Sequence, residues 1–146
     1  MLRHPMKPLR WIMFVVAPFG TMFTLGGVWN SVLFAGYYAK HAPAITRPAA
    51  ELKMPFLLAG YAVAVACMAF LFSQSFKARV SVLEGFQFGA LFGLIMTLPV
   101  YLLTHAGWDV HLGILLADSA WQTLEKGLGG VAMALIFRPS VEPKAS

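Results

Sequence analysis

Four long apolar stretches constrain the fold of this chain more than any other feature of its sequence. They cover about residues 11–38, 55–76, 80–103 and 111–137, and each reaches or exceeds the roughly 20 residues that a helix needs to cross a bilayer. Hydrophobic residues make up 59% of the chain and charged residues only 12%, whereas soluble domains carry roughly 25% charged residues. We therefore expect an all-α integral membrane protein, with residues 1–146 forming a single four-transmembrane-helix bundle.

Basic residues at the flanks of these stretches predict how the chain is oriented. With four spans, the two termini and the loop between the second and third spans lie on one side of the membrane. That side holds seven Lys and Arg residues, which are Arg3, Lys7, Arg10, Lys77, Arg79, Arg138 and Lys144. The other side holds three, which are Lys40, Arg47 and Lys53. Because cytoplasmic loops carry an excess of Lys and Arg, we expect both termini to be cytoplasmic.

The net charge of +5 does not form a basic face, because its residues are scattered among these flanks. We therefore expect the lipid bilayer, and not nucleic acid, to be the partner of the basic residues. Aromatic side chains at the flanks are expected to anchor the helices at the two interfaces. They are Trp11, Tyr37, Tyr38 and Trp108.

The fourth stretch carries a polar stripe formed by Asp118, Gln122 and Glu125. Their spacing of i, i+4 and i+7 places all three on one face of a helix. A charged side chain in hydrocarbon costs on the order of 2.5 to 3.5 kcal/mol on insertion scales, so this face must meet protein, water or a partner. We expect the stripe to be the place where any function resides.

Matching the stretches by depth, at about 1.5 Å rise per residue, offers each of these charges a partner inside the bundle. Asn30 falls at about the level of Asp118, and we expect its amide to donate to that carboxylate. Lys126 is expected to extend along its helix toward Glu84 and Gln87 near the cytoplasmic end of the third stretch. Such groups either hold the helices together or line a path for protons or cations, and the sequence leaves both alternatives open.

Glycines predict which helices pack most tightly. Gly85, Gly89 and Gly93 repeat every four residues in the third stretch, which leaves one helical face without side chains. Gly127 and Gly130 provide a matching face in the fourth stretch. We therefore expect the third and fourth helices to form a close antiparallel pair.

Metal and cofactor chemistry are not expected. Cys67 is the single cysteine, so the sequence offers neither a disulfide nor a thiolate cluster. His111, Asp118 and Glu125 share one helical face, but successive members lie about 10 Å apart along the axis, whereas a metal holds its ligands at about 2 Å. The G-x-S-x-G, P-loop and H-E-x-x-H motifs are not present in the sequence. We therefore expect no metal, no cofactor and no catalytic residue.

Three segments resemble a group of small membrane proteins. They are GGVWNSVLF (26–34), EGFQFGALFG (84–93) and LADSAW (116–121), the last followed by Gly127 to Gly130. Together they are similar to the small four-span bacterial proteins grouped as DUF1761-like or DUF2177-like, although Asn30 stands where many of those proteins have Tyr. The resemblance implies a four-helix, multi-pass protein of the bacterial inner membrane and supplies no activity.

Two functions of different classes remain. In the first, the chain is a non-enzymatic helical module that acts as an accessory subunit of a membrane complex or as a homo-oligomer. In the second, it is a small transporter or channel in which Asp118, Gln122 and Glu125 line a path for protons or cations. A membrane enzyme ranks third, because buried carboxylates and His105 can do acid and base chemistry but nothing arranges them around a substrate. We favour the module.

Overall fold

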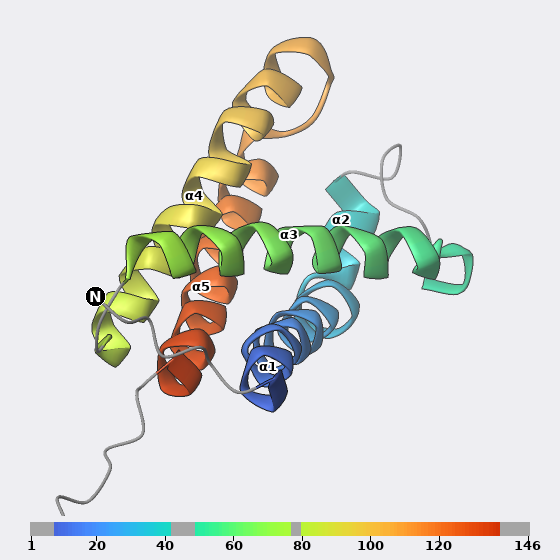
Figure 1. Cartoon of the computed structure of the whole chain (residues 1–146). Helices are drawn as coiled ribbons and strands as arrows, with labels where there is room; N and C mark the ends of the chain where they lie inside the picture. The colour runs from blue at the N-terminus through green and yellow to red at the C-terminus, as the bar shows by residue number, and fades with distance from the viewer. Residues whose placement is uncertain (1–7, 42–48, 77–79, 138–146) are drawn as a thin grey trace, which may run out of the picture.

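The computed structural model describes residues 8–41, 49–76 and 80–137, whose regular elements are all helices (Figure 1). The elements are α1 (Pro8–Val28), the π-helical η1 (Trp29–Leu33), α2 (Ala35–His41), the 3-10 helix η2 (Ala49–Glu51), α3 (Met54–Ser75), α4 (Val82–Gly107) and α5 (Leu112–Phe137). The predicted all-helical class is confirmed for this part of the chain.

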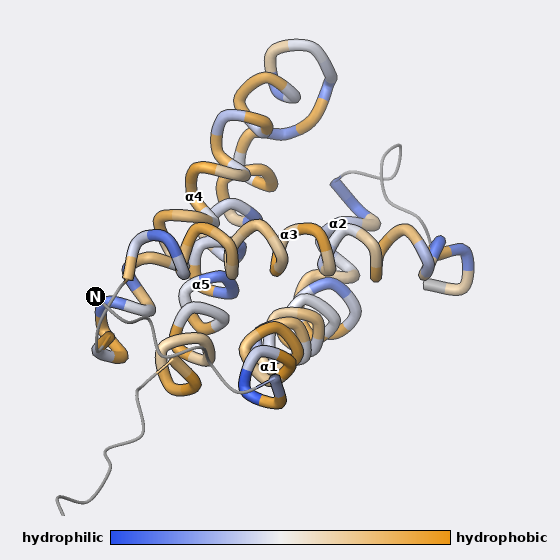
Figure 2. Tube along the Cα trace, in the orientation of Figure 1, coloured by the Kyte–Doolittle hydropathy of each residue, from blue (hydrophilic) through white to orange (hydrophobic). Residues whose placement is uncertain are grey.

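Three helical segments are long and apolar enough to cross a membrane, namely Pro8–Leu33, Met54–Ser75 and Val82–Gly107. α5 has 26 residues but carries the charged side chains discussed below, and it is not one of the three. Figure 2 shows apolar colour along α1, α3 and α4, and polar colour in the middle of α5. Three such helices are consistent with the predicted membrane protein.

The predicted helix over residues 11–38 is interrupted in the structure. The backbone N–H of Phe34 donates to the carbonyl oxygen of Trp29, five residues earlier, at 2.9 Å, which is the π-helical pattern. Phe34 then leaves helical geometry, with φ −117° and ψ 1°, and α2 begins at the next residue. The Trp29 ring stacks on Phe34 at 3.7 Å between centroids and on Trp121 of α5 at 4.4 Å. Tertiary stacking thus accompanies the break.

A capping box fixes the start of α4. The Ser81 hydroxyl accepts a hydrogen bond from the Glu84 backbone N–H at 3.1 Å, and the Glu84 carboxylate accepts one from the Ser81 N–H at 2.7 Å. The Glu84 side chain is exposed and bonds to Ser81 in its own helical turn. The expected contact with Lys126 is not formed, because Lys126 donates to Glu125 instead. Gln87 is exposed as well.

Glycines bring the backbones of α4 and α5 together. Gly85, Gly89 and Gly93 are all buried. A Cβ atom added at Gly85 would lie 2.6 Å from the Cβ of Ala134, and one at Gly93 would lie 2.6 Å from the carbonyl oxygen of Gln122. A Cβ at Gly89 would meet the backbone of α5 at even closer range. Cβ atoms in proteins essentially never come this close to other atoms, so only glycine permits the two helices to approach to this distance.

Phe72 of α3 joins four helices at one end of the molecule. Its ring centroid lies 5.6 Å from Phe14 of α1, 5.1 Å from Phe88 of α4 and 5.5 Å from Phe137 of α5. Figure 1 shows α3 lying across the other helices, with the far end of the α4–α5 hairpin extending beyond it. The start of α1, the end of α3, the start of α4 and the end of α5 therefore meet at this end.

Candidate functional site

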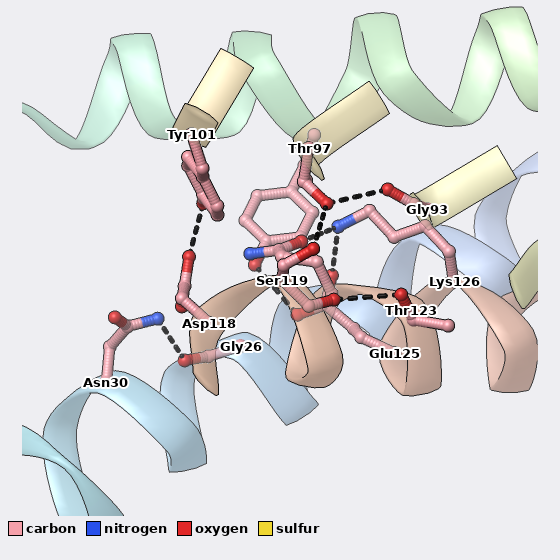
Figure 3. A network of polar contacts seen from close by, with 12 residues as sticks. Gly26, Asn30, Gly93, Thr97, Tyr101, Asp118, Ser119, Thr123, Glu125 and Lys126 are labelled. Carbon is pink, nitrogen blue, oxygen red and sulfur yellow. Dashed lines mark hydrogen bonds and ion pairs between the residues drawn. The ribbon is translucent and has the colours of Figure 1, made fainter. Parts of the chain in front are cut away.

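A buried ion pair lies at the centre of the candidate site (Figure 3). The side chain of Glu125 is 0% exposed, and its carboxylate lies 2.5 Å from the ammonium of Lys126. Lys126 also donates to the amide oxygen of Gln122, one helical turn earlier. Tyr61 of α3 donates to the second oxygen of Glu125 at 3.3 Å, and the Lys126 ammonium lies 5.3 Å from the centre of the Tyr61 ring. Each charge therefore has an opposite charge and a further polar partner.

Gly26 allows α1 to pack closely against this ion pair. A Cβ atom at Gly26 would lie 3.0 Å from a Glu125 carboxylate oxygen and would collide with the Tyr61 hydroxyl. The Gly26 carbonyl oxygen accepts a hydrogen bond from the side-chain amide of Asn30 at 2.9 Å. This bond corrects the expected pairing of Asn30 with Asp118, because the amide uses a carbonyl one turn earlier on its own helix instead.

Asp118 is held by two tyrosines from two other helices. Tyr38 of α2 donates to one carboxylate oxygen at 2.8 Å, and Tyr101 of α4 donates to the other. The Tyr38 hydroxyl in turn accepts a hydrogen bond from the indole N–H of Trp29 at 2.9 Å. Within residues 8–41, 49–76 and 80–137, no Lys or Arg forms an ion pair with Asp118. The two carboxylates of α5 therefore differ, because Glu125 has its own cation.

Hydroxyl groups occupy the helical turns between the two carboxylates. Thr97 of α4 and Ser119 of α5 lie 3.2 Å apart at their hydroxyl oxygens, which links these helices. Thr97 also donates to the Gly93 carbonyl, and Thr123 donates to the Ser119 carbonyl, each at 2.8 Å. These bonds satisfy the hydroxyls within the protein and connect the glycine-lined interface to the carboxylate stripe.

The predicted stripe therefore faces other helices along its whole length. Asp118 and Gln122 are half-buried and Glu125 is buried. The described residues contain no group of three or more His, Cys, Asp or Glu side chains that could hold a metal ion.

Sequence reasoning missed three hydroxyl partners of the stripe. They are Tyr38, Tyr61 and Tyr101. Tyr38 was expected only as an interfacial anchor, and the other two were not considered. Extending the depth comparison from amides and charges to every hydroxyl in an apolar stretch would have revealed Tyr61 and Tyr101, because a phenol can donate to a carboxylate.

Comparison of the chain with protein-family models, with curated proteins and with solved structures finds no match.

Proposed function

We propose that the chain is a multi-pass protein of the bacterial inner membrane, with four spans and cytoplasmic termini, that works as a non-enzymatic helical module. The observation that carries this proposal is that both carboxylates of α5 find partners inside the chain. Glu125 has Lys126 and a tyrosine of α3, and Asp118 has tyrosines of α2 and α4. Side chains bonded in this way act as links between helices.

The internal ion pair supports α5 as the fourth span. A charge facing lipid costs on the order of 2.5 to 3.5 kcal/mol, but Glu125 and Lys126 are only 0% and 7% exposed and neutralise each other. The 26 residues of α5, at about 1.5 Å rise each, exceed the roughly 30 Å of the hydrocarbon core. The pair thus removes the main objection to burying α5 in a bilayer.

The arrangement of the helix ends supports cytoplasmic termini. At the end where the four helices meet, Arg10 donates from its Nε to the carbonyl oxygen of Ile136 at 2.6 Å. This basic residue complements the carbonyl end of α5. The same end adjoins the sequence segments that carry seven of the flanking Lys and Arg residues, and the positive-inside rule assigns such an end to the cytoplasm.

The face between α1 and α5 supports a partner in the membrane. Gly20, Thr24, Leu128 and Ala132 contribute to an open groove of about 640 Å³. A side chain added at Gly20 would meet no atom within 4 Å. Small residues let another helix approach closely, so we propose that this groove receives a helix of a larger membrane complex. A second copy of the chain is the alternative occupant.

Purification in mild detergent tests the module. We expect the chain to run as an assembly larger than its 15.9 kDa mass, and mass spectrometry would show whether it contains other proteins. Gly20→Leu should fill the groove and release the partner. Gly60→Leu, on α3, is the matched control, because Gly60 also has open space around it and does not line the groove. A monomeric wild-type chain, or a Gly20→Leu chain that assembles normally, would contradict the proposal.

A small transporter or channel for protons or cations is the second candidate. The observation that favours it is Asp118, whose described partners are hydroxyls and not a cation. A carboxylate without a counter-ion in a membrane protein is a common element of ion and proton paths. Flux of protons, Na⁺ or K⁺ into vesicles that contain the purified chain would support this candidate. The candidate also requires that Asp118→Asn stop the flux while the protein stays folded.

A further inference from the structure

The segment of residues 29–41, called here the α2 arm, joins α1 through a non-helical residue. The arm consists of η1 and α2, and Phe34 between them has neither π-helical nor α-helical geometry. No residue of η1 or of α2 is buried. Only Trp29, Phe34 and Tyr38 are even half-buried, so a few side chains hold the arm in place, which is typical of segments that open locally.

Polar and stacking contacts connect the arm to α5. The Tyr38 hydroxyl donates to the Asp118 carboxylate at 2.8 Å and accepts from the indole N–H of Trp29 at 2.9 Å. The Trp29 ring stacks on Trp121 at 4.4 Å between centroids, with an interplanar angle of 7°. Tyr101 approaches the same carboxylate from α4. Asp118 is thus the point at which the arm, α4 and α5 are tied together.

We infer that Asp118 is a proton-binding site and that its protonation releases the α2 arm from the α4–α5 hairpin. An ionised carboxylate only accepts hydrogen bonds, which suits the two tyrosine hydroxyls that donate to it. When a proton from the aqueous side binds one carboxylate oxygen, that oxygen becomes a donor, and one tyrosine must turn or lose its acceptor. The remaining bonds are then neutral, and charge-assisted hydrogen bonds are roughly twice as strong as neutral ones.

The groups around Asp118 indicate that its carboxylate controls the contact between the arm and the α4–α5 hairpin. The titratable groups that face it are Tyr38 from the arm and Tyr101 from α4. On its own helix, Glu125 is already paired with Lys126, and Tyr61 of α3 donates to Glu125. Asn30 of the arm is neutral, and its amide donates to the carbonyl oxygen of Gly26 on α1. The proposed release of the arm goes beyond both proposed functions, since it depends only on these local contacts.

Distance measurements between spin labels test whether protonation of Asp118 releases the arm. Labels would be placed at Lys40→Cys on the arm and Leu103→Cys on α4, in a Cys67→Ala chain reconstituted in lipid nanodiscs. Both sites are exposed. Spectra would be recorded at about pH 8 and about pH 4, which bracket the range where carboxyl groups ordinarily titrate. We expect a single short distance at high pH, and about a tenfold larger population of longer distances at low pH.

Substitutions separate Asp118 from the other titratable groups of the region. Asp118→Asn should show the longer distances at both pH values, and Tyr38→Phe should do the same because it removes the donor. Tyr37→Phe is the matched control, since the neighbouring Tyr37 is exposed and packs edge-to-face against His41 of the same arm. It should respond to pH as the parent does.

The outcomes decide the inference in either direction. A pH response that persists in Asp118→Asn would assign the effect to another group, such as His41 on the arm, and would overturn the proposal. Identical distances at both pH values in the parent chain would overturn it as well. Unchanged helix content in all variants, measured by circular dichroism, would show that the arm moves without loss of the fold.

Discussion

The ammonium of Lys126 lies 2.5 Å from the carboxylate of Glu125, its immediate neighbour in the sequence. Consecutive residues of a helix point about 100° apart, so this contact requires both side chains to bend toward the same interior space. Tyr61 of α3 closes that space, and Gly26 of α1 makes room for it. One helix thus supplies both charges, and its neighbours supply the enclosure.

The ion pair leads to a prediction about stability. Glu125→Gln leaves the Lys126 ammonium buried without its counter-charge, so we expect a loss of about 3 to 5 kcal/mol in unfolding free energy. Lys126→Met should cost a similar amount. The double substitution should recover most of the loss, because a buried pair replaced as a whole is often tolerated. Denaturant unfolding in detergent, analysed as a double-mutant cycle, measures the coupling. Additive losses would show that the two charges do not depend on each other.

The glycine face of α4 leads to a second prediction. A side chain at Gly89 would meet the backbone of Lys126, which cannot move away cheaply, as well as the flexible end of the Met68 side chain. Gly89→Leu should therefore cost at least about 1 kcal/mol, within the usual 1 to 3 kcal/mol for bulk inserted into a packed interior. Gly60→Leu is the control, because Gly60 has open space around it. Equal stability of the two variants would mean that α4 and α5 do not pack through this face.

Much of the helical framework was predictable because apolar stretches are local signals. The predicted ranges 55–76, 80–103 and 111–137 correspond to α3 (Met54–Ser75), α4 (Val82–Gly107) and α5 (Leu112–Phe137). The interruption after Val28 was not predictable, since the break involves Trp29 stacking on Trp121, more than ninety residues away. Local periodicity carries no information about such a contact.

The polar stripe was predictable but its partners were not. The spacing of Asp118, Gln122 and Glu125 alone places them on one face, and that face is turned toward the other helices. The partner of each polar side chain depends on how far that side chain extends and on whether a backbone carbonyl competes for it. The depth of a residue in the membrane describes neither. Asn30 bonds to a nearby carbonyl, and Lys126 reaches a carboxylate on its own helix.

The proposed orientation makes a third prediction. Single cysteines at Ser146 and at Gly107, in a Cys67→Ala background, should be labelled by a membrane-impermeant maleimide from opposite sides. Gly107 ends α4 and is exposed, at the end of that helix away from the aromatic cluster around Phe72. The seven-to-three distribution of basic residues predicts that Ser146 reacts from the cytoplasmic side. Labelling of both positions from the same side would contradict the four-span topology.

Asp118 allows the structural and conducting roles of the stripe to be separated. Asp118→Asn keeps an amide that can bond to Tyr101 at the α4–α5 interface, so we expect global stability to change little even though the α2 arm is released. Asp118→Leu strands the hydroxyls of Tyr38 and Tyr101 and should cost about 1 to 3 kcal/mol. Asp109→Leu, at an exposed aspartate before α5, controls for the loss of an acidic residue and should be neutral. If the chain conducts, Asp118→Asn should abolish proton or cation flux in vesicles although it folds. Equal destabilisation by Asp118→Asn and Asp118→Leu would contradict this prediction. It would mean that the helices require the negative charge of Asp118 and not only its hydrogen bonds.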